Sequence, residues 1–331
     1  MSPIEWFRSA AATMPGPDTA SGDAVTARAA EILRPTGALA RLDIVAAWMA
    51  TWQRTTSPHV HKPAALIFAA DHGVTAAGVS KYPTDVTAAM LAAYRAGKST
   101  INAFAAVAGA TVSAIDVGVG RPTGDIRFES AMSVSRFDEA VAAGRDAVLN
   151  LDADLLILGE MGIGNTTAAA SVAAALGGGE VAAWVGRGTG VDDEGLQRKR
   201  EAVRQAVSRI AGVTDPFEVL REVGGAELVS MAAAIVAARH RDLPVVIDGY
   251  VVTASALPLV SVSDSALDHC IIGHCSAEPG HRRLLERLDK QPLLDLDMRL
   301  GEGSGAMAAV PLIAMACVGI TDVPTFGEWF A

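Results

Sequence analysis

A glycine-rich segment at residues 159–167 (GEMGIGNTT) combines residue types that can bind a phosphate group. It follows the apolar run DLLIL and precedes an Ala-rich stretch, which predicts a turn from a strand into a helix. Gly162 and Gly164 let a ligand approach the backbone, and the N–H groups that open the helix at Asn165 and Thr166 lack helical partners. The pattern predicts a phosphate cradle, and a plain turn capped by Asn165 or Thr166 is the alternative.

Two glutamates stand beside glycines at the borders of apolar segments. Glu160 ends the apolar run, where a buried carboxylate requires a partner. Glu302 lies between Gly301 and Gly303 and precedes a long stretch without charge. Taken alone, Glu302 is explained by a favourable interaction with the dipole of the helix that follows it.

A cation on an apolar helix face is the third candidate. Acidic residues at positions 192–194 follow a glycine-rich loop that includes Gly188, and they predict a helix start. Lys199 then falls on the same face as Leu196 and Val203. We expect Lys199 either to meet a substrate phosphate or to extend its ammonium group to the surface.

Other polar residues follow apolar runs. Asp71 and His72 either contact a substrate or merely cap each other, and Ser276 precedes an EPGH turn that predicts another anion-facing helix start. Five residues of metal-binding types stand close together, but their spacing contains neither C-x2-C nor H-x3-H, so no metal site is predicted: His269, Cys270, His274, Cys275 and His281.

The elements that would position these groups alternate along the chain. Apolar runs predict strands at residues 64–71, 111–120, 153–160, 180–188, 243–249 and 269–275, separated by helical stretches. This pattern predicts an α/β fold with a parallel sheet covered by helices on both faces. In such sheets ligands bind at the carboxyl ends of strands, where Asp116, Arg187 and Asp248 also lie.

The remaining chain predicts a helical appendage. Residues 14–24 are rich in turn formers, and the segment after them predicts two helices broken at Pro35. We expect residues 1–62 to form an N-terminal helical cap region that packs with the C-terminal helices, and residues 63–331 to form the α/β core.

Composition excludes several classes of protein. A net charge of −10 disfavours binding to nucleic acid, whose partners carry basic surfaces. Three cysteines are typical of a reducing compartment, and the N-terminus lacks a secretory pattern, so we expect a cytoplasmic protein. Because Pro311 interrupts the longest uncharged stretch, no membrane span is predicted.

Seven ordered segments between about residues 30 and 317 resemble the nicotinate-nucleotide:dimethylbenzimidazole phosphoribosyltransferase family of cobalamin biosynthesis. The matching residues are ADHGV...GVS.YP..VT, GEMGIGNTTAAAS, GRGTG.DDEGL.RK, GGAEL..MAAAI, VVIDGYV.TASAL, GH.SAEPGH and LLDLDMRLGEGSGA. The resemblance implies a Rossmann-like parallel sheet, a smaller helical subdomain from the chain ends, and a homodimer. It also implies transfer of the 5-phosphoribosyl group of nicotinate mononucleotide to 5,6-dimethylbenzimidazole, which gives α-ribazole 5'-phosphate and nicotinate.

The resemblance also implies residue roles. Glu302 falls on the position of the general base, and the acceptor base would contact Glu160, Met161, Ser80 and Leu300. The residues implied on the phosphoribosyl and phosphate side are Gly162, Gly164, Asn165, Thr166, Gly188, Lys199, Asp248 and Ser276. The leaving pyridinium already carries a positive charge, so neither a metal nor another cofactor is expected.

The chain departs from the family pattern at two places. Ala89 stands in VTAAM where the family usually has Gln, and AGKSTIN replaces GG.AIN. These departures leave open another aromatic acceptor, such as adenine, another benzimidazole or a phenol. A non-catalytic nucleotide-binding subunit is a further alternative, whereas an NAD-dependent oxidoreductase would need a dinucleotide fingerprint that is absent.

Overall fold

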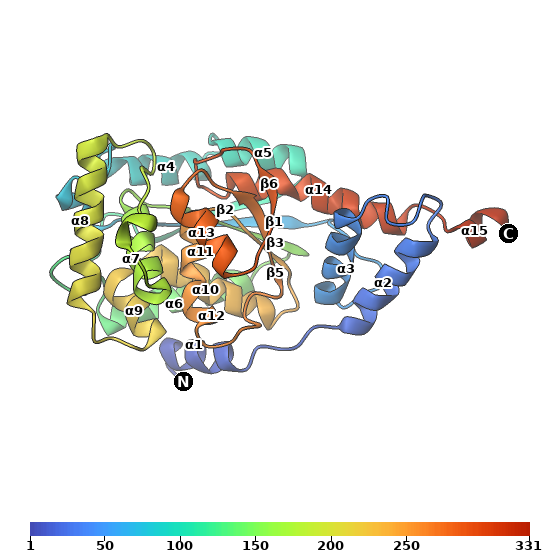
Figure 1. Cartoon of the computed structure of the whole chain (residues 1–331), viewed down its shortest axis with the longest axis horizontal. Coiled ribbons are helices and arrows are strands. Elements are labelled where there is room, and N and C mark those ends of the chain that lie inside the picture. The colour runs from blue at the N-terminus through green and yellow to red at the C-terminus, as the bar shows by residue number, and fades with distance from the viewer.

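The computed structural model describes residues 1–331 and contains one six-stranded sheet (Figure 1). All neighbouring strands are parallel, and their order is β2-β1-β3-β4-β5-β6. The strands are β1 (Pro63–Ala70), β2 (Thr111–Gly118), β3 (Leu155–Met161), β4 (Val245–Ile247), β5 (Cys270–Cys275) and β6 (Pro292–Asp295). The expected parallel α/β architecture is confirmed.

Alternate residues of the central strands enter two separate hydrophobic cores. Leu66 and Phe68 of β1 pack into the larger core, whereas Ala65 and Ile67 pack into the smaller one on the opposite face. The larger core contains residues of α1 (Pro3–Ala12), α6 (Val134–Leu149), α7 (Asn165–Gly177), α8 (Asp193–Arg209), α9 (Pro216–Val223), α10 (Ala226–Arg239), α11 (Tyr250–Ser255), α12 (Leu257–Val260) and α13 (Pro279–Arg287). The smaller core contains residues of α2 (Thr19–Glu31), α3 (Arg41–Gln53), α4 (Asp85–Arg95), α5 (Thr100–Ala108) and α14 (Ser304–Thr321). Helices therefore cover both faces, as expected.

The strand predicted at residues 180–188 is wrong. This segment contains a short 3-10 helix, η2 (Val181–Ala183), and Trp184 then donates from Nε1 to the carbonyl of Gly178 over 2.9 Å. Because α7 ends in three consecutive glycines, the chain turns back and its apolar residues pack beside α13 and α8 instead of joining the sheet. The sixth strand is β6, whose residues are only half buried or exposed.

Two segments that contain turn formers are more helical than their composition suggests. Residues 14–24 are rich in turn formers, but α2 begins at Thr19, and the Asp18 side chain accepts from the N–H of Ser21. Pro311 lies inside α14 without ending it. A proline removes one hydrogen bond from a helix. Burial of Val310 and Ile313 in the smaller core keeps this one continuous.

Helices from both ends of the chain pack together on one face of the sheet, except for α1. α2 and α3 pack together and against α14, and Ile32 forms a bridge with Thr325 just before α15 (Phe326–Phe330). In contrast, α1 lies against α6 and α10 on the other face, where the Phe7 and Phe217 ring centroids are 4.8 Å apart (Figure 1). Residues 1–62 therefore do not form one continuous cap, and a domain boundary near residue 62 stays a prediction.

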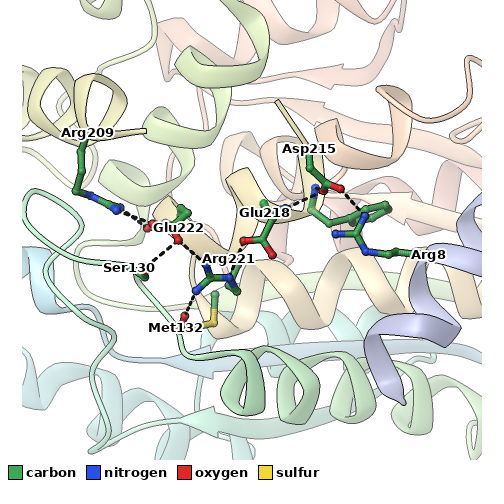
Figure 2. A network of polar contacts seen from close by, with 9 residues as sticks. Arg8, Ser130, Met132, Arg209, Asp215, Glu218, Arg221 and Glu222 are labelled. Atoms are coloured by element: carbon green, nitrogen blue, oxygen red, sulfur yellow. Dashed lines mark hydrogen bonds and ion pairs between the residues drawn. The ribbon is translucent and has the colours of Figure 1, made fainter. Parts of the chain in front are cut away.

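A polar network fixes α8 and α9 relative to the loop before α6 (Figure 2). Glu222 accepts from Arg209 over 2.5 Å, from Arg221 over 2.5 Å and from the Ser130 hydroxyl over 2.8 Å. Burial would raise the pKa of Glu222, but these partners lower it below its ordinary value. The network anchors the end of α8, the helix that carries Lys199.

α14 is the one helix long and apolar enough to cross a bilayer, but 56% of its apolar window is buried inside the protein. The buried side of α14 packs against β3 and β5. Its hydropathy is therefore that of a helix covering one face of the sheet.

Candidate active site

Three adjoining pockets lie where the strands of the sheet end. The first, here called the polar pocket, is lined by residues at or just after the carboxyl ends of β3, β4 and β5, including Glu160, Gly249 and His274. The second, the apolar pocket, has a volume of about 640 Å³ and contains Glu302. The third, the lysine pocket, contains Lys199. Met161 and Leu300 line both the polar and apolar pockets, so these two spaces share a wall.

The apolar pocket has the size and lining of a site for a flat organic ring. Its volume falls within the range of about 300–1,000 Å³ that is usual for small-molecule sites. Its apolar lining comes mainly from α4, α5, β3 and the loop after β6, with Val86, Met90, Phe104, Met161, Met298 and Leu300. The sequence-based prediction placed Met161 and Leu300 beside an acceptor base, and the structure places both at this pocket.

Glu302 is the one carboxylate among the residues that line the apolar pocket. The residue is 5% exposed, and its Oε2 has no hydrogen-bond partner. Burial raises the pKa of Glu302, and the nearby Tyr94 hydroxyl and Ile101 N–H lower it in part. An unpartnered carboxylate of raised pKa that faces an apolar space can accept a proton from a bound ring.

The backbone conformation of Glu302 is unusual. Its φ is +67°, between φ values of +82° at Gly301 and +87° at Gly303. A residue other than glycine in this region costs roughly 1–2 kcal/mol. Such strain persists only where the surroundings enforce it. Gly159 of β3 is part of these surroundings, because a Cβ at that position would lie 2.3 Å from the carbonyl oxygen of Glu302.

Asp248 holds this loop in place. The predicted phosphoribosyl contact would require Asp248 to line a pocket, and it does not. Its Oδ1 accepts from the N–H of Ala306 over 2.8 Å, and its Oδ2 accepts from the N–H of Gly303 over 3.2 Å. Asp248 is absent from the residues that line the three pockets. Asp248 is 1% exposed, and its buried carboxylate oxygens accept from free N–H groups at the start of α14, next to Glu302.

Glu160 lies at the wall between the polar pocket and the loop of Glu302. The amide of Asn165 donates to Oε2 of Glu160, and a Cβ on Gly301 would lie 2.6 Å from Oε1. Burial raises the pKa of Glu160 to about 8, although the bond from Asn165 lowers it in part. The side chain of Asn165 therefore hydrogen-bonds to Glu160, while α7 begins at its backbone beside the polar pocket.

Glu160→Gln is expected to stabilise the free protein at alkaline pH. Between pH 4.5 and about 8 the folded wild type holds a proton on Glu160 that the unfolded chain has lost, so its stability falls as pH rises through this range. The variant lacks this effect. Urea unfolding should therefore show the variant gaining on the order of 2 kcal/mol over wild type between pH about 5 and about 9. A gain independent of pH, or one shared by the exposed control Glu31→Gln, would refute this explanation.

The lysine pocket contains a buried ammonium group. Lys199 is 1% exposed, and its Nζ donates to the Thr166 hydroxyl over 2.9 Å. The alternative that Lys199 extends to the surface is therefore wrong. Burial lowers the pKa of Lys199 to about 8, and the Glu278 carboxylate raises it in part. Gly162, Gly164 and Gly188 line the same pocket, so backbone and ammonium groups converge on one space suited to an anion.

Lys199→Met is expected to raise the KM for a phosphorylated substrate about 10–100-fold, since a hydrogen bond to a charged group contributes roughly 1.5–3 kcal/mol. The wild-type KM should also rise above pH about 8, where the free enzyme loses the ammonium proton. Steady-state kinetics with varied donor concentration would measure both effects. The matched control is Arg204→Met, at an exposed position of α8. An unchanged KM in Lys199→Met would contradict the assignment.

Ser80 lies in the lysine pocket, whereas the sequence-based prediction placed it beside the acceptor base. It is absent from the lining of the apolar pocket, because the loop after η1 (Gly73–Ala77) runs toward α8, where Arg198 donates to the carbonyl of Gly78 over 2.9 Å. Its position fits a contact on the phosphate side better than the predicted one.

Ser276 and Glu278 face the polar pocket with unpartnered atoms. The Ser276 hydroxyl and Oε2 of Glu278 are both buried without a hydrogen-bond partner. The Oε1 of Glu278 accepts from the N–H of Gly188 over 2.7 Å. Sequence reasoning missed Glu278 as a site residue. Glu278 is the N-cap residue of α13, directly before Pro279, but its side chain does not cap that helix.

Asp71 and His72 do not cap each other, and neither lines the three pockets. Asp71 accepts from the N–H of Gly120 over 2.8 Å, whereas His72 pairs with Glu227 over 2.6 Å between Nε2 and Oε1. Both residues fix loops behind the site. His269 is likewise buried in the core, where burial lowers its pKa to about 3.

The fold and these pockets define a class of enzyme. The anion site, the polar pocket and the apolar pocket lie together at the carboxyl ends of the parallel strands. The apolar pocket contains an unpartnered carboxylate. This combination suits group transfer from a phosphorylated donor to an apolar acceptor.

Comparisons with known proteins identify the family. A family profile described as "Phosphoribosyltransferase" matches residues 14–329. The nicotinate-nucleotide–dimethylbenzimidazole phosphoribosyltransferase of Brucella anthropi is 44% identical over 98% of this chain and 96% of its own, and the Methylocella silvestris enzyme of that name is 47% identical over 99% and 96%. The crystal structure of CobT from Thermus thermophilus has a TM-score of 0.90 at 41% identity, covering 94% of this chain and 99% of that one. The chain belongs to the nicotinate-nucleotide–dimethylbenzimidazole phosphoribosyltransferase family.

The structure also places the departure at Ala89. On α4, Val86 and Met90 line the apolar pocket, whereas Ala89 is exposed and is absent from its lining. Ala89 therefore contributes nothing to the lining of this pocket.

Proposed function

We propose that this phosphoribosyltransferase moves the 5-phosphoribosyl group of nicotinate mononucleotide to 5,6-dimethylbenzimidazole, with Glu302 as the general base. The observation that carries the proposal is the buried, unpartnered Oε2 of Glu302 in an apolar pocket of about 640 Å³. The polar and lysine pockets adjoin this space and supply an anion site for the donor.

In this reaction one ring nitrogen of the acceptor attacks the anomeric carbon of the donor. The bond from that carbon to the pyridinium nitrogen breaks, and its electron pair neutralises the nicotinate ring. The proton on the other acceptor nitrogen passes to Glu302. The product is α-ribazole 5'-phosphate, with the configuration at the anomeric carbon inverted because acceptor and leaving group lie on opposite sides.

The remaining site residues hold the two substrates. Met161 and Leu300 form the shared wall and contact the acceptor, with Glu160 behind them. Lys199, Thr166 and the glycines of the lysine pocket bind the phosphate, and Ser276 and Glu278 offer their free oxygens to the ribosyl hydroxyls. Positioning of both substrates supplies much of the rate enhancement in such transfers.

We also propose that the enzyme is a cytoplasmic homodimer. The family assignment supports the dimer. The three cysteines, Cys270, Cys275 and Cys317, are all free thiols, as expected in a reducing compartment.

The test is incubation of the purified protein with nicotinate mononucleotide and single acceptors, with nicotinate and the ribosylated product separated by chromatography. Fastest turnover with 5,6-dimethylbenzimidazole would support the proposal. Preference for adenine, another benzimidazole or a phenol would replace the acceptor but keep the reaction class. Failure to release nicotinate with any acceptor would refute the proposed reaction.

A further inference from the structure

Two histidines and one aspartate lie near the amino ends of the strands, at the opposite end from the active-site pockets. His59 and His61 stand in the segment that leads from α3 into β1, and Asp154 stands directly before β3. The strands bring them together, because Pro63 pairs with Leu155 and the N–H of Asp154 donates to the carbonyl of Lys62 over 3.2 Å. One possible ligand atom from each of the three side chains lies within 4.8 Å of the others.

Only one of the two oxygens of the Asp154 carboxylate accepts hydrogen bonds. Its Oδ2 accepts from the N–H of His61 over 2.6 Å and from the N–H of Lys62 over 2.9 Å. Its Oδ1 is buried and has no hydrogen-bond partner. A buried carboxylate oxygen without a donor is costly, which is the situation that a bound cation relieves.

The His59 ring is oriented as a metal ligand would be. Its Nδ1 lies 3.1 Å from the carbonyl of Ser57, which can only accept, so Nδ1 carries the proton and Nε2 has a free lone pair. That Nε2 lies 3.8 Å from Oδ2 of Asp154. Ligating histidines commonly donate their other ring N–H to a backbone carbonyl in this way. Gln53 fixes the backbone of His59 from both sides, accepting from its N–H over 3.1 Å and donating to its carbonyl over 2.8 Å.

The His61 ring completes the group. It stacks on the His59 ring with a centroid separation of 4.5 Å and an interplanar angle of 23°. Because the His61 side chain is exposed, it can rotate to shorten the distances to those of a coordinated ion.

We propose that His59, His61 and Asp154 bind a divalent transition-metal ion of the zinc type. Two imidazole nitrogens and one carboxylate oxygen are ligands that Zn²⁺ accepts, with water at the remaining position. The ion would tie the α3–β1 segment to the start of β3. It would act on stability and not on catalysis, since the pockets lie at the other ends of these strands.

The sequence alone predicts no metal site here, because the three ligands are not closely spaced along the chain. Asp154 lies 93 residues after His61, so only the pairing of β1 with β3 reveals the group. The chain also offers few competing ligands. Four of its seven histidines are buried, all three cysteines are buried, and His240 is the other exposed histidine.

Calorimetric titration of the chelator-treated full chain with Zn²⁺ would test the site. One saturable site is expected in wild type and in the matched control His240→Ala. His61→Ala should weaken binding at least about tenfold, as loss of a ligand removes more than the loss of an outer contact. Mg²⁺, which prefers oxygen ligands, should not bind.

Thermal unfolding provides the second measurement. Saturating Zn²⁺ should raise the midpoint of wild type and of His240→Ala but not of His61→Ala, because binding to the folded state shifts the unfolding equilibrium. The midpoint of His61→Ala without metal should agree with that of wild type, which shows that this variant folds. His240→Ala loses a contact of 3.0 Å with the carbonyl of Ala10, so its midpoint with Zn²⁺ is compared with its own midpoint without metal. Absence of Zn²⁺ binding in wild type, or equal binding by wild type and His61→Ala, would overturn the proposal.

Discussion

Replacing Glu302 with glutamine is expected to lower kcat about 10²–10⁴-fold, the usual contribution of a positioned proton acceptor. Glutamine keeps the size of the side chain but cannot take the proton from the acceptor. Because the phosphate and ribosyl contacts come from other residues, the KM for nicotinate mononucleotide should stay near its wild-type value. Initial rates of nicotinate release with saturating acceptor would measure both constants.

The control for this variant is Glu31→Gln, at an exposed position of α2 far along the chain from the site. It should retain full activity. If Glu302→Gln also retained it, the base would have to be another group, and Glu160 is the nearest candidate on structural grounds. A large rise in KM with unchanged kcat would instead assign Glu302 to substrate binding.

Gly159→Ala is expected to reduce kcat/KM about 100-fold without a change in any polar group of the site. The added Cβ would lie 2.3 Å from the carbonyl oxygen of Glu302 and 2.8 Å from the N of Gly303, both backbone atoms. The loop must therefore move away from β3 and take the carboxylate with it. A displacement of roughly 1 Å is enough to lower a rate by about two orders of magnitude.

Gly16→Ala is the matched control for this variant, since a Cβ there meets no atom within 4 Å. Thermal unfolding should accompany the kinetics, because overpacking of this kind costs about 1–3 kcal/mol and the variant must be assayed while folded. Near wild-type kcat/KM in folded Gly159→Ala would show that the position of the Glu302 loop does not control the rate.

Local sequence patterns predicted the central elements well. β1 and β3 are buried on both faces, so their apolar runs stand out from the surrounding sequence. The edge of the sheet was harder to predict. The apolar run at residues 180–188 packs against helices instead, and the half-buried β6 has too little apolar character to be recognised. Hydropathy reports burial, and burial does not distinguish a strand from a turn packed on a helix.

The site shows the same division between local and distant effects. Flanking glycines drew attention to Glu302 and to the cradle around Gly162, because these patterns are contained in a few residues, and the family resemblance then implied the role of Glu302. The role of Asp248 as a cap for the Glu302 loop depends on a contact between residues 55 positions apart, and the bond from the Gly188 N–H to the Glu278 carboxylate joins residues 90 positions apart. Such contacts depend on how strands and helices pack, and no pattern within either segment encodes them.

The central claim, that Glu302 removes the acceptor proton, is tested most directly by the pH dependence of kcat in wild type and Glu302→Gln at saturating substrates. Burial raises the pKa of Glu302 in the free protein, and a bound ring would keep the carboxylate out of water in the substrate complex that kcat reports. The wild-type kcat should therefore fall tenfold per pH unit on the acid side of a midpoint above the ordinary pKa of a glutamate. The residual rate of Glu302→Gln should lack this acidic limb. An acidic limb of equal midpoint in both proteins would contradict the assignment of Glu302 as the base.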